Sequence, residues 1–243
     1  MKTRDVLRIA SVTLAGLVIA GLLAAGVSAA DPATGPKGEK LVPVEIKLPK
    51  PLFQGTPKNI KPAATLEKYV DKPRAPFLAP AGVKNLALNK KVTSSDSAPI
   101  IGELTMVTDG DKEGSDGSYV ELGPGTQWVQ IDLGAAANIY AFVVWHYHGE
   151  GRVYHDVVVQ VADDADFIEN VQTVYNNDFD NSSGLGLGKH LEYIDEYRGR
   201  LIDAKNAKGE PVKGRYVRLY SKGNTSNDMN HYVEVEVYGT PAK

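Results

Sequence analysis

Cysteine is absent from the sequence, which excludes disulfide bonds, thiol catalysis, cysteine metal sites and a lipoprotein anchor. A surplus of positive charge is absent too, because 30 Asp and Glu outnumber 27 Lys and Arg and the formal net charge is -3. No basic field is therefore available to hold nucleic acid or an anionic membrane surface. The 243 residues, 42% of them hydrophobic, are nevertheless enough to bury a core.

Helical periodicity is also missing from residue 83 onward, where short β-type runs end at Gly, Asn and Asp. In Thr126–Gly134, Val, Ile and Leu alternate with Trp, Gln and Asp, as in a strand with one face in a core. Tyr232–Gly239 alternates in the same way, so that two glutamates share the face opposite the valines. One helical turn is expected, at Asp164–Asn170.

Strand candidates recur at the spacing of an all-β sandwich. They are Lys91–Ser94, Ser118–Leu122, Trp128–Leu133, Ile139–Trp145, Asp156–Val161, Gln172–Asn176, Leu191–Tyr193, Arg215–Ser221 and Tyr232–Tyr238. We therefore predict one all-β domain over residues 83–243, folded as a jelly-roll β-sandwich whose functional loops gather at its two ends.

The first 30 residues have the composition of a secretory signal peptide. Lys2, Arg4 and Arg8 precede the apolar run Ile9–Val27, and small residues follow up to Ala30. Cleavage there would release the chain to the periplasm, the cell surface or the medium. The apolar run approaches the roughly 20 residues that span a bilayer, so an uncleaved membrane anchor remains the alternative.

Residues 31–82 are rich in proline and lysine, as in a semi-rigid extended linker or tether. Proline fixes φ and removes a hydrogen-bond donor, so no regular sheet is expected there. Apolar residues alternate over Val42–Leu48 and recur up to Leu78, which is more than a solvated spacer needs. The sequence therefore leaves open whether part of this segment lies on the domain or on a partner.

Five segments, in this order, resemble the discoidin or coagulation-factor-type C domain, which has a galactose-binding-like fold. They are Asn85–Ser95, Val107–Asp111, Trp128–Gly134, Val157–Asp164 and Gly214–Leu219. Three features depart from the family pattern: Tyr119 replaces its first tryptophan, Ala162–Ala165 replaces its Ser-Asp-Gly turn, and the framing disulfide of the animal members is absent. The missing disulfide points to the bacterial branch, whose secreted members resemble carbohydrate-binding modules.

The acidic loop Asp109–Gly114 spaces oxygen ligands like the first half of an EF-hand. An EF-hand is rejected because Val120 stands at position twelve and no helices are expected beside the loop. The resemblance implies instead a structural Ca²⁺ held by Asp109 and Asp111 with backbone carbonyls, and closed by Glu234 from the last strand. The alternative is a solvated turn in which Asp109 caps its own backbone.

A second polar constellation, Trp145–His155, combines aromatic, His and Arg side chains at a strand end, and Asn224–His231 is equally polar. Sugar rings stack on aromatic faces, and their hydroxyls need fixed hydrogen-bond partners. The resemblance implies that loops of this kind contact a glycan. The residues that we expect to face a ligand are His146, His148, Arg152, Tyr154, Asn227, Asn230 and His231.

The signals for an enzyme are weak. The His146–His148 pair has neither cysteines nor a His-Glu-x-x-His helix to support a catalytic metal, and Asp163, Asp164 and Asp166 share one turn instead of facing each other across a cleft. We therefore expect a secreted, non-catalytic recognition module that binds a polysaccharide or cell-surface glycan, with no nucleic-acid partner and no membrane contact unless the leader is uncleaved. The alternative is a protein-interaction or structural subunit of a larger extracytoplasmic complex.

Overall fold

The computed structural model describes residues 33–36, 38–53 and 57–242. The predicted signal peptide lies outside these residues. In the described ranges the chain forms strands and one 3₁₀ helix, and no helix there is long and apolar enough to cross a membrane. The elements are β1 (Leu41–Pro43), β2 (Leu78–Pro80), β3 (Lys84–Asn85), β4 (Lys91–Ser94), η1 (Leu104–Thr108), β5 (Val120–Leu122), β6 (Gln127–Trp145), β7 (Val158–Ala162), β8 (Gln172–Asn176), β9 (Arg200–Asp203), β10 (Val212–Ser221), β11 (Asn230–Tyr232) and β12 (Glu234–Pro241).

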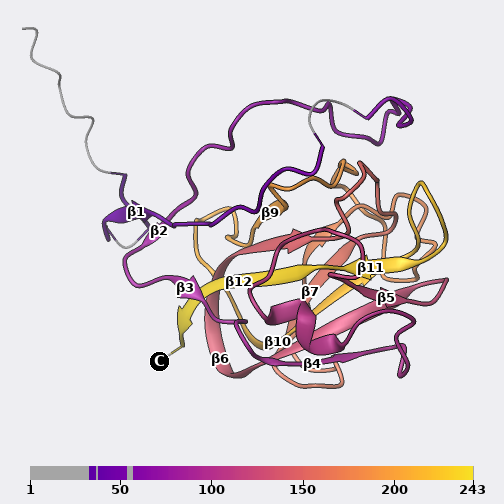
Figure 1. The fold of residues 1–243 in the computed structure, drawn as a ribbon. Helices are drawn as coiled ribbons and strands as arrows, with labels where there is room; N and C mark the ends of the chain where they lie inside the picture. The colour runs from indigo at the N-terminus through magenta and orange to yellow at the C-terminus, as the bar shows by residue number, and fades with distance from the viewer. Residues whose placement is uncertain (1–32, 37, 54–56, 243) are drawn as a thin grey trace, which may run out of the picture. The chain divides into compact units, whose positions relative to one another are not determined.

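The main sheet is antiparallel and has the order β3-β12-β6-β10-β7-β8, with β4 and β9 also pairing with β6. Strand β6 pairs with β10 from Gln127 to Ile139 and with β4 in its first half, and its second half pairs with β12 and β9. The strand curves from one layer into the other (Figure 1). The predicted jelly-roll β-sandwich is confirmed.

The two predicted strands Trp128–Leu133 and Ile139–Trp145 are one continuous strand, β6, in the structure. Gly134 lies between them at φ 86°, a conformation that favours glycine, and the three alanines after it are small. The chain therefore bends at Gly134 without leaving the sheet.

The core between the layers contains the residues that the alternation pattern placed there. Val129, Ile131 and Leu133 of β6 are buried with Val235 and Val237 of β12. Two other expectations were wrong. Leu191–Tyr193 is no strand, since only Glu192 makes a single bridge, and Asp164–Asn170 forms no helical turn.

The loop at Asp164 has a physical reason for not being helical. The Asp164 carboxylate accepts hydrogen bonds from the backbone N–H groups of Asp166, Ile168 and Glu169, which folds the segment around one side chain. Phe167 then lies at φ 59°, outside the helical region.

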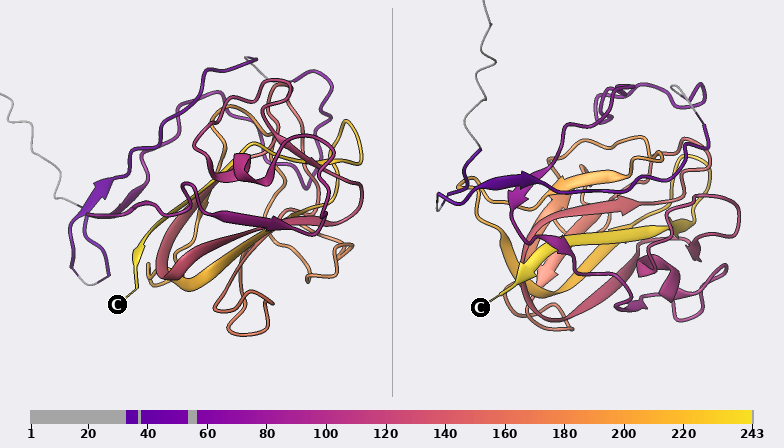
Figure 2. Two further views of the ribbon diagram at one scale, coloured as in Figure 1. Left: turned by 60° about the horizontal axis from the view of Figure 1, so that its bottom comes forward. Right: turned by 60° about the vertical axis from the view of Figure 1, so that its left-hand side comes forward.

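The outer face of β6 and β12 is covered by the proline-rich segment. Phe77 and Ala79 pack there with Trp145, Val143 and Tyr238 in a second apolar cluster. The short strands β1 and β2 pair with each other, so the segment contains one small piece of sheet that its prolines did not lead us to expect. Figures 1 and 2 draw the segment, in indigo to purple, along one side of the sandwich.

Residues 65–74, which we call the strap, join the loop that precedes β9. The Glu67 N–H donates to the Glu192 carbonyl and the Glu192 N–H donates to the Thr65 carbonyl, both at 2.8 Å. Arg74 Nη1 donates to the carbonyls of Arg198 and Gly199. In this structure the segment lies on the domain, which was the question that the sequence left open.

Phe77→Ala tests whether this cover contributes to stability. Because Phe77 is 8% exposed, the substitution should lower the free energy of unfolding by about 3 kcal/mol, measured by urea denaturation. Leu52→Ala is the control in the same segment, since Leu52 is 44% exposed and should cost less than about 0.5 kcal/mol. A segment that behaves as a detached tether would leave both variants as stable as the parent protein.

Candidate functional site

The acidic loop after η1 folds around its own aspartates. Asp109 Oδ1 accepts the N–H of Asp111 at 2.8 Å, and Asp111 Oδ1 accepts the N–H of Glu113 at 2.9 Å. Both side chains are exposed. The Gly110 N–H reaches across to Glu234 Oε2 at 3.2 Å, so the loop and the last strand meet as the family resemblance implied.

Glu234 is fully buried, and its Oε1 has no hydrogen-bond partner among the described residues. Burial, with a smaller contribution from the nearby Glu236 and Asp109 carboxylates, raises the pKa of Glu234 to about 9. Lys112 does not neutralise it, because Lys112 Nζ lies 2.6 Å from Glu236 Oε1. A buried carboxylate oxygen beside an acidic loop fits a hard cation, which prefers oxygen ligands.

Most of the predicted ligand contacts have no exposed surface. His146, His148, Tyr154, Asn230 and His231 are all at most 2% exposed. The reason is that the chain after β6 stays inside the domain instead of turning outward. A glycan in solution therefore does not reach these five side chains in this structure, and only Arg152 and Asn227 keep exposed atoms.

His146 and His148 are held by protein groups. His146 Nδ1 lies 3.3 Å from Asp195 Oδ1, and its ring stacks on Tyr154 with centroids 4.3 Å apart. His148 Nε2 pairs with the Lys112 carbonyl at 2.9 Å, and its ring lies against Gly114, where a Cβ would be 2.7 Å away. The two imidazoles thus join the end of β6 to the acidic loop and to the segment before β9.

A second set of buried, hydrogen-bonded side chains connects three segments. The Tyr154 hydroxyl lies 2.9 Å from His231 Nδ1, and His231 Nε2 lies 2.9 Å from Glu121 Oε2. A neutral imidazole satisfies both contacts, since Nδ1 accepts from the hydroxyl and Nε2–H donates to the carboxylate. Burial, together with the smaller effects of the nearby Arg152 and His146, lowers the pKa of His231 to about 4. We therefore take the pair with Glu121 as a hydrogen bond of neutral histidine.

Asn230 and Asn227 have backbone roles. Asn230 accepts from Ser221 Oγ and the Gly223 N–H, and its amide donates to the Gly123 carbonyl, which ties three loops together. Asn227 Oδ1 accepts from the Met229 N–H and from the Asn224 amide in a tight turn. Both residues shape the loop before β11.

Above these buried side chains lies a group that we call the end patch: the exposed Asp116, the partly exposed Tyr119, Glu121 and Arg152, and Tyr147, which is 8% exposed and packs among them. Tyr119 packs edge-on against Tyr147 at 5.0 Å and against His231 at 5.2 Å. The Arg152 guanidinium lies over the Tyr147 ring at 4.6 Å, and the Tyr147 hydroxyl donates to Asp116 Oδ1. The patch combines aromatic faces with donors and acceptors.

Sequence reasoning identified only Arg152 among these five as a ligand contact. A signal for two others was present, because Tyr119 and Glu121 are two apart in a candidate strand and so share one face. What the sequence did not show is that β5 pairs with β11, which brings that face against His231.

The end patch and the acidic loop lie on a jelly-roll β-sandwich, and a backbone hydrogen bond joins that loop to Glu234 of the last strand. Residues 106–193 match the model of a family described as the NedA-like, galactose-binding domain of the F5/F8 type C group. The predicted resemblance to the coagulation-factor-type C domain is therefore confirmed over residues 106–193.

Several solved structures are similar to this chain. A fucose-binding module from Streptococcus pneumoniae, SpX-3, is 20% identical, with 64% of this chain and 97% of that one covered and a TM-score of 0.44. A chitosan-binding module from a Paenibacillus sp. IK-5 chitosanase/glucanase is 23% identical, with coverages of 64% and 99% and a TM-score of 0.39. A family 89 glycoside hydrolase from Clostridium perfringens is 16% identical, with 65% of this chain and 15% of that one covered and a TM-score of 0.47. Comparison with curated proteins gives no match.

The lowered pKa of His231 makes stability depend on pH. A histidine that folding keeps neutral contributes stability above its unfolded pKa of 6.5, and this contribution is lost as the pH falls toward 4. Between pH 7 and pH 4, the parent protein should lose roughly 3 kcal/mol more than His231→Gln does, measured by urea denaturation at each pH. His148, whose pKa burial also lowers, is retained in both proteins. Equal losses in both proteins would show that Glu121 holds an imidazolium instead.

Proposed function

We propose that this domain is a non-catalytic module that binds a glycan at the end patch. The support from the comparisons is the match to a family described as galactose-binding. The patch supplies the chemistry that a sugar needs: Tyr119, which packs on the buried Tyr147, provides aromatic surface, Arg152 provides donors, and Glu121 and Asp116 provide acceptors.

The observation that carries the proposal is the buried support of the patch. Glu121 is fixed by His231, and His231 is fixed by Tyr154, whose side chain is 1% exposed. Polar groups that are already held in place lose little conformational entropy when a ligand binds. A patch with this support is suited to recognition.

The aspartates of the loop Asp163–Asp166 are not arranged as the carboxylate pair of a glycosidase, which favours a binding function over hydrolysis. A glycosidase needs two carboxyl groups that face each other across the sugar. Asp164 instead accepts hydrogen bonds from the backbone of its own loop, and those bonds lower its pKa. We assign this loop no catalytic role.

We further propose that Asp109, Asp111 and Glu234 hold a structural Ca²⁺, with carbonyls of the same loop completing its coordination. The buried Glu234 Oε1 supports this assignment because a cation would supply the partner that the described protein groups do not. Bound Ca²⁺ would fix the acidic loop to β12. We also propose export of the protein through its N-terminal signal sequence, so that the domain meets glycans outside the cytoplasm.

Calcium binding predicts a stability change. Excess Ca²⁺ should raise the melting temperature by several degrees over EDTA, because a ligand at about 100 times its Kd stabilises the folded state by about 2.7 kcal/mol. Glu234→Gln keeps the size of the side chain and should abolish the response, whereas Asp166→Asn, in a separate acidic loop, should retain it. The same melting temperature in EDTA and in Ca²⁺ would exclude the site.

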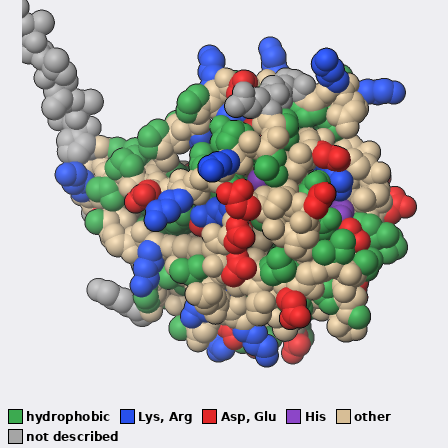
Figure 3. All heavy atoms as spheres, viewed as in Figure 1, with side chains coloured by type: hydrophobic (Ala, Val, Ile, Leu, Met, Phe, Trp, Pro, Cys, Tyr) green, Lys and Arg blue, Asp and Glu red, His purple; other side chains and the backbone are tan. Residues whose placement is uncertain are grey.

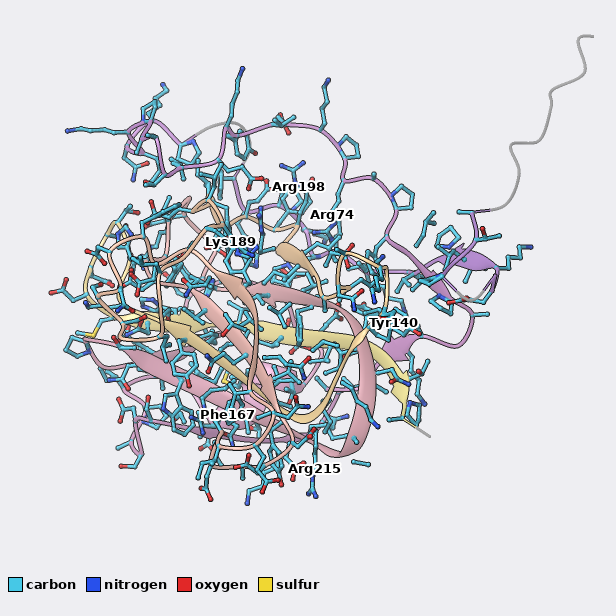
Figure 4. The ribbon with its side chains drawn as sticks, turned by 180° about the vertical axis from the view of Figure 1, so that it is seen from behind. Arg74, Tyr140, Phe167, Lys189, Arg198 and Arg215 are labelled. Atoms are coloured by element: carbon cyan, nitrogen blue, oxygen red, sulfur yellow. The ribbon has the colours of Figure 1, made fainter. Side chains whose placement is uncertain are left out.

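Glycan binding is tested by affinity electrophoresis in gels that contain galactosides, after a glycan array has identified a retained sugar. Tyr119→Ala and Arg152→Ala should each weaken retention at least tenfold, a loss typical of a central contact. Arg215→Ala is the matched control, since Arg215, labelled in Figure 4, pairs with Asp132 of β6 and is no part of the end patch. Unchanged retention in both patch variants would move the site elsewhere.

A further inference from the structure

A cavity of about 290 Å³ lies between the strap and the segment 193–201. Its lining includes Glu67 and Arg74 from the strap, and Tyr193, Glu196, Arg198 and Arg200 from the segment before and in β9. Figure 4 shows Arg74 and Arg198 close together at this junction. The cavity is separate from the end patch and exists only because the strap lies on the domain.

The three arginines differ in how their donors are used. Arg198 donates to Glu196 and to the carbonyls of Val70 and Lys72, so it holds the strap in place. Arg200 Nη1 donates to Glu67, while its Nε is buried and has no partner among the described residues. Two of these guanidiniums therefore have a carboxylate neighbour.

Arg74 has none. Its Nη1 donates to two backbone carbonyls, at 3.1 and 3.0 Å, and within the described ranges no carboxylate lies at ion-pair distance from it. Burial lowers the pKa of Arg74, and repulsion from Arg198 and Arg200 lowers it further, with Glu196 opposing this. A half-buried cation with like charges as neighbours and without its own counter-ion is stabilised by an added anion.

A neutral donor lies in the same cavity. Tyr193 is 5% exposed, and its hydroxyl has no hydrogen-bond partner in the described part of the chain. The Arg200 guanidinium covers its ring at 4.8 Å. Burial raises the pKa of Tyr193, so the hydroxyl keeps its proton at neutral pH and is available to donate it in a hydrogen bond.

The surroundings favour an anion as well. The basic residues between Pro57 and Arg74 are Lys58, Lys61, Lys68 and Lys72, against the acidic Glu67 and Asp71. All four lysines are exposed, and Figure 3 shows Lys and Arg side chains along the edge where this segment runs. Such a cluster raises the local concentration of anions although the whole chain is slightly acidic.

We propose that this cavity binds an oxyanion, namely a carboxylate, sulfate or phosphate group, with Arg74 and Arg200 as its charged donors and the Tyr193 hydroxyl as its neutral donor. A planar guanidinium is suited to two parallel hydrogen bonds with such a group. Two sources share this chemistry: a free inorganic anion, and an acidic sugar of a glycan. In the second case the cavity is a further subsite, and that assignment rests on the proposed function.

The first test uses inorganic sulfate and the full-length protein. Thermal unfolding is measured in sodium sulfate and in sodium chloride of equal ionic strength, for the parent protein, Arg74→Gln and Arg215→Gln. Sulfate stabilises most proteins through exclusion from their surface, and Arg215→Gln measures that general effect at a distant arginine. We expect the parent protein and Arg215→Gln to show the same sulfate shift and Arg74→Gln to show less than half of it.

Since Arg74→Gln also removes hydrogen bonds to the segment before β9, Tyr193→Phe provides a second variant that should fold normally. Removing a buried hydroxyl without a partner should leave the melting temperature in chloride unchanged or raise it slightly. Its apparent affinity for sulfate, from titration calorimetry, should fall severalfold. Equal sulfate responses in the parent protein, Arg74→Gln and Tyr193→Phe would overturn the proposal.

The second test separates the two sources. Binding of an oligogalacturonide is compared with binding of a neutral galacto-oligosaccharide of equal length. A glycan subsite predicts that Arg74→Gln abolishes the preference for the acidic chain, while Tyr119→Ala weakens both. Sulfate binding without any glycan binding would support the oxyanion site and contradict the proposed function. Glycan binding at the end patch with no specific sulfate response would support the proposed function and contradict the oxyanion site.

Discussion

The domain depends on polar side chains that are buried in hydrogen-bonded pairs at the end of the sandwich. An imidazole or carboxylate taken out of water is costly unless its polar atoms find partners. Here the Tyr154–His231–Glu121 chain links the loop after β6 to β11 and β5, and His146 with Asp195 links the same loop to the segment before β9. The positions of the partly exposed Tyr119 and Arg152 follow from this buried layer.

The proline-rich segment has a comparable role on the outer face. Trp145 is fully buried there, its indole N–H donates to the Tyr197 carbonyl, and its ring lies against Gly199, at φ 62°, where a Cβ would be 2.5 Å from it. Phe77 and Ala79 complete this layer from the other side. The strap thereby brings Arg74 beside Arg198, which creates a charged cavity from two segments more than a hundred residues apart.

The sequence predicted those features that depend on local periodicity. Lys91–Ser94 and Gln172–Asn176 are strands with the predicted bounds, and the valines of β12 face the core. Periodicity cannot show what covers the second face of a strand, so the burial of Glu234 and of His146 was missed. It also cannot show that β5 pairs with β11, on which the end patch depends, or that Asp164 collects three backbone N–H groups and prevents a helical turn.

The central claim is that the end patch, supported from below by neutral His231, is where a glycan binds. The most direct measurement is a crystal structure of the protein with a galactoside that the array has identified. Our account predicts a sugar ring against Tyr119, with its hydroxyls within hydrogen-bond distance of Arg152 and Glu121 and with His231 still buried. A sugar bound away from these residues, or one that reaches His146 and His148 after the loop has opened, would contradict it.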